Sequence, residues 1–116
     1  TLTAAEALAP EIETEVVDLR CLNPLDDGPL MDSVRRTGRC LIVTEAVTTC
    51  SVASEIAARV SEQCFDWLEE PPLRLGGEDI PIPVSPALER ASIPDARLIE
   101  DVARWLVARE APSWAA

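Results

Sequence analysis

Histidine is absent from this sequence, and its absence removes several kinds of site. A Ser-His-Asp arrangement needs an imidazole as general base, so Ser51 and Ser85 have no evident partner that could activate them. Structural zinc sites draw on histidines and paired cysteines, and the cysteines here form no Cys-x-x-Cys pair. The four cysteines are Cys21, Cys40, Cys50 and Cys64. A zinc site is therefore weakly supported, and we predict no metal ligand in this chain.

Glycine is also scarce, with four residues in the chain. Gly76 and Gly77 follow a short apolar run, but no Gly-x-Gly-x-x-Gly or Walker pattern accompanies them, which argues against a phosphate-binding loop. Adjacent acids such as Asp26-Asp27 are plentiful, yet neighbouring carboxylates on a loop are nearly always solvated rather than catalytic. We therefore predict no catalytic residue and no cofactor-binding residue.

Basic residues are outnumbered, because 10 arginines face 21 acids and give a net charge of −11. Nucleic-acid binding needs clustered cations, so this balance argues against it. The acid excess serves either solubility or the attraction of a basic protein partner. No apolar run approaches the ~20 residues that cross a bilayer, and no basic, apolar leader opens the chain. We expect no membrane association and a cytoplasmic protein, or a mitochondrial matrix protein if the source is eukaryotic.

The stretch Gly38 to Ala46 predicts the centre of the fold. Three consecutive apolar residues, Leu41 to Val43, are typical of a parallel strand that is covered on both faces. Gly38 can take the left-handed conformation that ends a helix. Ligands and partners of open α/β sheets meet the carboxyl ends of such strands, which here begin at Thr44 and Glu45.

The other expected elements are given by residue range. We predict a helix over 3–9, one from Asp26 or Asp27 to Gly38, one from an N-cap at Thr48, Thr49 or Ser51 to the stop at Pro71-Pro72, and one after a cap at Asp95. Strands are predicted at 14–20, 40–44 and 73–75, and an extended surface path over 76–89. Apolar stripes are expected at Leu30, Met31 and Val34; at Val52, Ile56, Val60, Cys64, Phe65 and Leu68; and at Leu98, Ile99, Val102, Trp105 and Leu106. The alternation of strands and helices in 116 residues predicts one three-layer α/β/α domain with a mostly parallel sheet.

Three details complete these expectations. Cys40 and Cys64 lie in apolar contexts and are predicted to be buried thiols, whereas Cys50 lies at a loop-to-helix junction that favours a reactive thiol. The tail 111–116 is expected to fray unless Trp114 docks. Five acids near one base, Arg74, indicate either a docking patch or a solvated rim; they are Asp66, Glu69, Glu70, Glu78 and Asp79.

Four stretches, taken together in their order along the chain, are distinctive: residues 15–27 (EVVDLRCLNPLDD), 32–46 (DSVRRTGRCLIVTEA), 53–83 (ASEIAARVSEQCFDWLEEPPLRLGGEDIPIP) and 92–106 (SIPDARLIEDVARWL). They resemble the C-terminal domain of the beta subunit of the 2-oxo acid dehydrogenase decarboxylase, of pyruvate or branched-chain type. The spacing of Glu55, Cys64-Phe65 and Leu68-Glu69 is slightly closer to the branched-chain type.

The resemblance implies a transketolase C-terminal-like fold in an enzyme that decarboxylates a 2-oxo acid and transfers the acyl group to a lipoyl group. Thiamine diphosphate and Mg are then held by the alpha subunit and by the beta subunit's N-terminal domain, not by this domain. Its implied role is assembly with the alpha subunit and a second beta subunit, and docking of the basic subunit-binding domain of the lipoyl acyltransferase. The implied docking acid is Glu69, and we add its neighbours Glu70 and Asp66.

The chain departs from this family in two ways. Thr44 stands where the family often has a histidine, and no glycine-rich turn follows. Two family strands have no counterpart in residues 1–116, and one of them belongs between the strands predicted at 14–20 and 40–44. We therefore expect either a natural start before Thr1 or another segment that supplies the missing pairing, and a chain that is inactive by itself. The alternatives are a free-standing, non-catalytic α/β interaction module and the C-terminal domain of another transketolase-superfamily enzyme.

Overall fold

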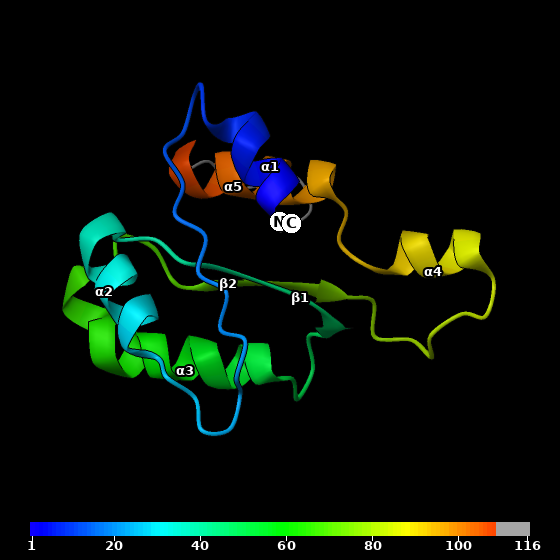
Figure 1. Cartoon of the computed structure of the whole chain (residues 1–116), viewed down its shortest axis with the longest axis horizontal. Coiled ribbons are helices and arrows are strands. Elements are labelled where there is room, and N and C mark those ends of the chain that lie inside the picture. The colour runs from blue at the N-terminus through cyan, green and yellow to red at the C-terminus, as the bar shows by residue number, and fades with distance from the viewer. Residues whose placement is uncertain (109–116) are drawn as a thin grey trace.

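A two-stranded parallel sheet lies at the centre of the computed structural model, which describes residues 1–108 (Figure 1). Strand β1 (Leu41–Val47) pairs with β2 (Leu73–Gly77), with Leu41 opposite Leu73 and Val43 opposite Leu75. Helix α3 (Val52–Cys64) connects the two strands. The strands predicted at 40–44 and 73–75 are therefore confirmed, and both are longer than predicted.

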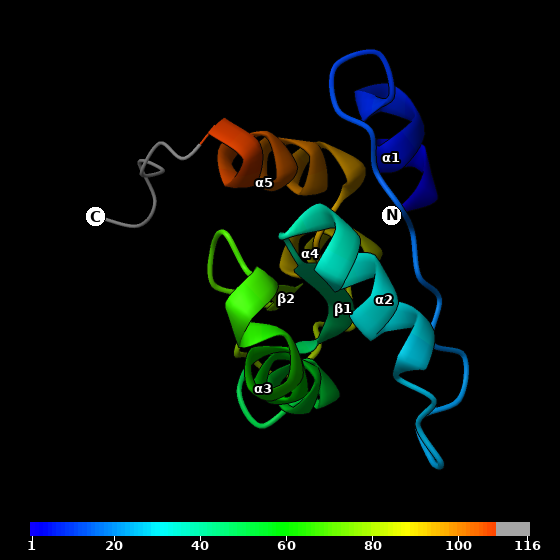
Figure 2. The same cartoon turned by 90° about the vertical axis from the view of Figure 1, so that its left-hand side faces the viewer.

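Helices cover both faces of this sheet. Helices α2 (Gly28–Thr37) and α3 lie on one side, while α1 (Leu2–Leu8) and α5 (Ala96–Ala108) pack together on the other (Figures 1 and 2). The predicted three-layer α/β/α arrangement is thus confirmed. The tail 111–116, predicted to fray unless Trp114 docks, lies outside the described residues.

The main hydrophobic core lies between β1, α2 and α3. The predicted faces of these helices are buried, and Val60 and Cys64 are completely inaccessible. The thiols of Cys40 and Cys64 are buried, as predicted. The core consists of Leu30, Met31, Val34, Cys40, Ile42, Ala53, Ile56, Val60 and Cys64. At the two ends of the predicted stripe, however, Val52 and Phe65 are exposed.

A second buried group joins α1 to α5 and is separate from that core. Helix α5 begins after Asp95, whose Oδ1 accepts a hydrogen bond of 2.8 Å from the backbone N–H of Leu98, so the predicted cap is confirmed. Leu98 itself is exposed and Trp105 is half-buried, so the predicted stripe is narrower than expected. The buried members of this group are Ala4, Leu8, Ile99, Val102 and Leu106.

A groove of about 1380 Å³ lies between the two buried groups. Residues 41–44 of β1 line it, together with Ile99 and Leu106 of α5 and residues 11–20 of the chain before α2. The groove therefore runs beside β1, which has a strand partner on one edge only in the part of the chain that the structure describes.

The strand predicted at 14–20 is wrong. These residues form no strand and cross the direction of β1 and β2 instead of running along them (Figure 1). Val17 and Leu19 still pack against the core, so their apolar character reflects partial burial without a backbone ladder. Glu15 anchors the segment, because it accepts hydrogen bonds from Ser33 and Arg36, and these bonds lower the pKa of its carboxyl.

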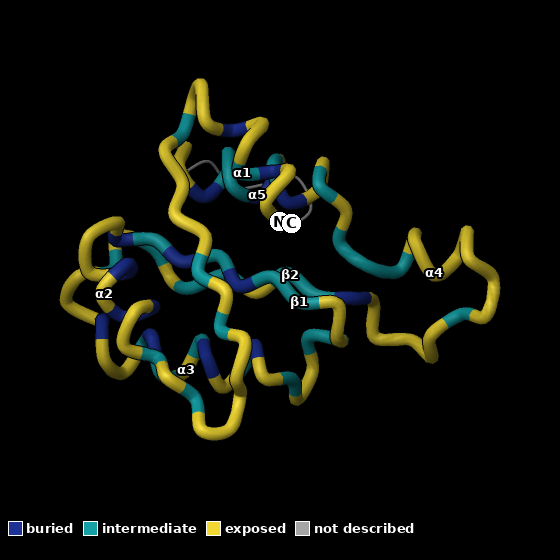
Figure 3. Tube along the Cα trace, in the orientation of Figure 1, coloured by how far each residue is buried: buried dark blue, intermediate teal, exposed yellow. Residues whose placement is uncertain are grey.

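The extended surface path predicted over 76–89 is wrong in part. Proline suits the first position of a helix, and α4 (Pro86–Ser92) begins at Pro86. Residues 78–92 also project from the body instead of wrapping over it (Figures 1 and 3), and Val84 is 99% exposed. A hydrogen bond of 2.8 Å from Glu78 N–H to Ser92 O closes the base of this arm.

The two remaining helix predictions are close to the observed bounds. Helix α1 ends two residues before Pro10. Asp27 occupies the N-cap position of α2 without capping it through its side chain, whereas Asp26 Oδ1 accepts a hydrogen bond of 3.3 Å from Gly28 N–H. Within residues 1–108, none of the helices combines the length and the hydrophobicity that a bilayer crossing requires.

Candidate functional site

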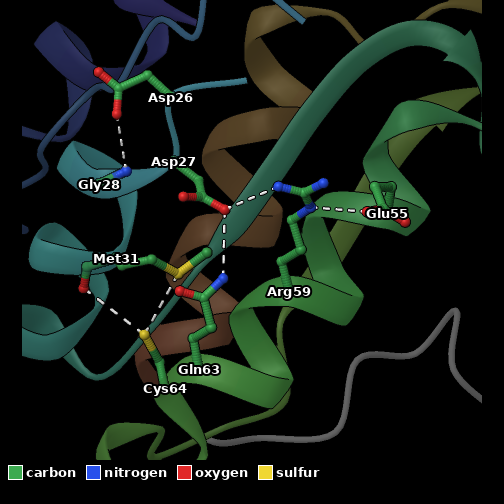
Figure 4. Close-up of polar contacts among 8 residues, drawn as sticks. All are labelled: Asp26, Asp27, Gly28, Met31, Glu55, Arg59, Gln63 and Cys64. Carbon is green, nitrogen blue, oxygen red and sulfur yellow. Dashed lines mark hydrogen bonds and ion pairs between the residues drawn. The ribbon is translucent and has the colours of Figure 1, made fainter. Parts of the chain in front are cut away.

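The three predicted docking acids lie in and just after a 3₁₀ turn, Phe65–Trp67, at the end of α3. The turn is anchored on both sides. Before it, the buried thiol of Cys64 contacts Met31, at 3.8 Å from its carbonyl oxygen and 3.6 Å from its sulfur (Figure 4). After it, Leu68 packs against the core, and its N–H donates to Cys64 O at 3.2 Å. The residues between these anchors face outward.

Ion pairs between α2 and α3 fix the position of this turn further. Asp27 Oδ2 accepts hydrogen bonds from Arg59 at 3.1 Å and Gln63 at 3.4 Å, and Arg59 also bonds Glu55 at 2.8 Å (Figure 4). The hydrogen bond from Arg59 lowers the pKa of the Asp27 carboxyl. Because both helices are tied near one end and packed along the core, the end of α3 has little freedom to shift.

Glu69 is oriented by a base that the sequence reading missed. Arg39 forms an ion pair of 2.6 Å with Glu69 Oε2, and its Nε donates to Leu106 O of α5 at 3.2 Å. The N–H of Glu69 donates to Gly38 O at 2.8 Å. Gly38 has a φ of +68°, and a Cβ there would lie 2.9 Å from Glu69 Cγ. The pairing of Arg39 with Glu69 could have been inferred from the predicted topology. Arg39 precedes β1 and Glu69 precedes β2, and two neighbouring parallel strands start at the same end of the sheet.

The five acids counted from the sequence do not form one patch. Glu69 and Glu70 precede β2, whereas Glu78 and Asp79 follow it, so the length of the strand separates the two pairs. Asp79 instead accepts a hydrogen bond of 2.8 Å from Thr49 Oγ1. Asp66 is exposed beside the first pair. The predicted docking residues Asp66, Glu69 and Glu70 thus stay together, and Glu78 and Asp79 lie elsewhere.

The carboxyl edge of the sheet is closely packed. A Cβ on Gly76 would lie 2.7 Å from Ala46 O, and one on Gly77 would lie 2.7 Å from Glu45 O. These glycines therefore allow β2 to approach β1, which is a sufficient reason for them without a phosphate. Arg74 lies near the start of β2, and its guanidinium donates to Thr48 O, just after β1, at 3.3 Å and to Ser54 Oγ at 2.6 Å.

The cysteines differ sharply in their surroundings. Burial raises the pKa of the Cys40 thiol to about 11, which suits an inert structural thiol. Cys50 is exposed and has a φ of +54° just before Ser51, the N-cap of α3. Among residues 1–108, no three His, Cys, Asp or Glu side chains are placed so that they could hold a metal ion.

These features define a class of protein: an α/β/α domain with a parallel sheet and an acidic, exposed turn at one end of it. Residues 1–99 match the family described as Transketolase, C-terminal domain, and the chain belongs to that family. The match covers most of the chain and includes both strands.

Three relatives illustrate the likeness. The chain is 39% identical over 101 residues to the pyruvate dehydrogenase E1 component subunit beta of Rhizobium meliloti, covering 87% of this chain and 22% of the relative. It is 48% identical to that subunit of Leifsonia xyli, covering 90% and 32%. It is 43% identical to the acetoin:2,6-dichlorophenolindophenol oxidoreductase subunit beta of Cupriavidus necator, covering 89% and 31%. The chain thus spans between 22% and 32% of the length of these relatives. They support the pyruvate type, and the branched-chain leaning stays a prediction.

Proposed function

We propose that this chain is the docking and assembly domain of a thiamine-diphosphate-dependent dehydrogenase beta subunit. The observation that carries the proposal is the turn at the end of α3, where Asp66, Glu69 and Glu70 lie together on an anchored backbone. A basic subunit-binding domain of a lipoyl acyltransferase fits this surface by charge. Such complementarity raises the association rate and fixes the orientation of the partner.

The residues described do not fit the cofactor. A magnesium diphosphate needs oxygen ligands in a cluster, and residues 1–108 offer no group of three or more acidic or other ligating side chains. The space beside Gly76 and Gly77 is occupied by the backbone of β1, so these glycines leave no room for a phosphate group. Thiamine diphosphate and Mg therefore belong, in this proposal, to the alpha subunit and the N-terminal domain of the beta subunit. This domain adds contacts with the alpha subunit and the second beta subunit.

The relatives set the breadth of the substrate proposal. Pyruvate enzymes and acetoin enzymes match this chain with similar identity, 48% and 43% in two examples. The proposal accordingly covers both substrates, because residues that select between them belong to other parts of the enzyme. The relatives include bacterial and mitochondrial proteins.

Charge reversal tests the docking role. In the assembled enzyme that contains this chain, we expect Glu69→Arg/Glu70→Arg to weaken binding of the purified acyltransferase subunit-binding domain by ~10-fold at low salt, with a smaller effect at high salt. Isothermal titration calorimetry at several salt concentrations measures the affinity and its dependence on salt. Glu6→Arg, an exposed position on α1, is the matched control because it changes the charge far from the turn.

One outcome is decisive. Equal binding by the double variant and the native enzyme would refute the docking role. Because Glu69→Arg also breaks the ion pair with Arg39, Asp66→Arg is measured in parallel; it changes the charge of the same turn without removing that ion pair.

A further inference from the structure

Two aromatic side chains are exposed at this same turn. The whole sequence holds one phenylalanine and three tryptophans, so aromatic residues are rare. Phe65 is nevertheless 76% exposed and Trp67 is 50% exposed. The sequence reading placed Phe65 on the buried face of α3, and the structure turns it into solvent instead. Exposing both residues within one short turn leaves apolar surface in water that burial would stabilise.

The backbone of the turn explains their display. Helix α3 ends at Cys64, and the tighter winding of the 3₁₀ turn rotates the next residues away from the helix's buried face. Leu68 then adopts an extended conformation and returns to the core. Cys64 is buried and Leu68 is partly buried against the core, so hiding the aromatic rings would require the turn to break these contacts.

Trp67 also has a cationic neighbour from α2. The guanidinium of Arg35 lies 5.4 Å from the centroid of the Trp67 ring, which is within cation–π range. Arg35 is itself fixed by an ion pair of 3.2 Å with Asp32. A ring that is already oriented loses little conformational freedom on binding, and large aromatic side chains of this kind dominate the energy of protein interfaces.

The charges around the rings specify the kind of partner. Asp66 lies between the two aromatic residues, and Glu69 and Glu70 follow them. The nearby bases Arg35 and Arg39 are each paired with an acid of this chain. The surface therefore combines an apolar centre with a negative border, and its complement is a positive surface that carries an apolar side chain.

We propose that Phe65 and Trp67 form the apolar anchor of the docking surface, and that they receive an apolar side chain of the basic subunit-binding domain. This inference rests on the proposed function. Charge steers the domain to the turn, and burial of the two rings then slows its dissociation.

The test compares single truncations in the assembled enzyme that contains this chain, with the purified acyltransferase subunit-binding domain as the probe. Phe65→Ala and Trp67→Ala are each expected to weaken binding by ~10- to 30-fold, mainly through faster dissociation. The affinity of both aromatic variants is expected to depend on salt concentration as steeply as the affinity of the native enzyme does, because the lost contact is apolar. Val84→Ala is the matched control: this residue is also apolar and exposed, but it lies on the arm. The Val84→Ala variant is expected to bind the subunit-binding domain with the affinity of the native enzyme.

Comparison with the charge variants separates the two proposals. If the acidic variants weaken binding and both aromatic variants bind within ~2-fold of the native enzyme, the aromatic anchor is refuted and the docking role stands. If neither set changes the affinity, the docking role fails as well. If the aromatic variants leave the affinity unchanged but lower the mass of the assembled enzyme, the rings face another subunit, and the anchor is again refuted. Should Trp67→Ala lower the thermal stability, Phe65→Ala decides the question, because the Phe65 side chain is the more exposed of the two.

Discussion

The open edge of β1 leads to a prediction about residues 1–116 expressed by themselves. Cys40 O accepts a hydrogen bond of 2.9 Å from Leu73 N–H, so it points toward β2. Backbone groups of successive strand residues alternate between the two edges. Leu41 and Val43 therefore direct their N–H and C=O groups away from β2 and toward the groove.

The magnitude follows from these groups. If the α1–α5 layer closes over the groove, the four groups lose water, and at about 1–3 kcal/mol each they cost about 4–12 kcal/mol. A small domain has a total stability of about 5–15 kcal/mol. If the layer stays open instead, the apolar side chains that line the groove remain in water. Either way, we expect the isolated chain to be expanded or self-associated, and a segment from outside these residues to complete the sheet.

Two measurements check this expectation. Small-angle X-ray scattering should give a radius of gyration above the 14.4 Å of the structure, and hydrogen exchange should be fast at the amides of Leu41 and Val43. The same amides should be protected in the assembled enzyme, which is the control. A monodisperse chain that is as compact as the structure, with slow exchange at both amides, would refute the reasoning.

Three further predictions concern the interior and the helix ends, and all are measured in the assembled enzyme. Gly38→Ala should lower the free energy of unfolding in urea by about 1–2 kcal/mol, because alanine resists the left-handed conformation, and its Cβ should also displace Glu69. Gly38→Asn should relieve the backbone strain but still displace Glu69. Equal losses of stability in the two variants would contradict the backbone contribution. Alkylation of Cys40, followed by mass spectrometry, should keep accelerating up to a pH of about 11, because burial raises the pKa of its thiol. The exposed Cys21 should be alkylated faster than Cys40, and equal rates would show that Cys40 is not shielded. Asp95→Ala should cost about 1 kcal/mol and increase exchange in the first turn of α5; unchanged exchange there would show that the cap is dispensable.

Elements whose signals are local could be predicted from the sequence. The apolar run at Leu41–Val43, the stop at Gly38 and the cap at Asp95 each depend on neighbouring residues, and each prediction is confirmed. The strand prediction for residues 14–20 failed because a strand needs a neighbouring strand to pair with. The apolar residues of this segment do not by themselves reveal whether such a neighbour is present. The same applies to Phe65, which continues the apolar spacing of α3 but lies beyond the point where the helix tightens into a 3₁₀ turn.

The candidate site was harder to predict, because its geometry depends on distant pairs. The acids at 66–70 were found from charge alone. The ion pair of Glu69 with Arg39, however, joins residues that lie before β2 and before β1, and these become neighbours only when the two strands pair in the folded sheet. The separation of Glu78 and Asp79 from these acids likewise depends on the direction and length of β2. Charge counting along the chain therefore finds candidates but does not show which of them share a surface.

The charge distribution explains why an apolar anchor is needed in addition to the acids. Most arginines are held in ion pairs within the chain, so the excess of acids remains on the outside and is spread over many elements. The arginines in these pairs are Arg20, Arg35, Arg36, Arg39, Arg59 and Arg104. A field of that kind attracts a basic partner from many directions but favours no single position strongly. Among residues 1–108, the exposed rings of Phe65 and Trp67 give the turn at the end of α3 an aromatic surface, whereas the exposed apolar side chains after Glu78 and Asp79 are aliphatic.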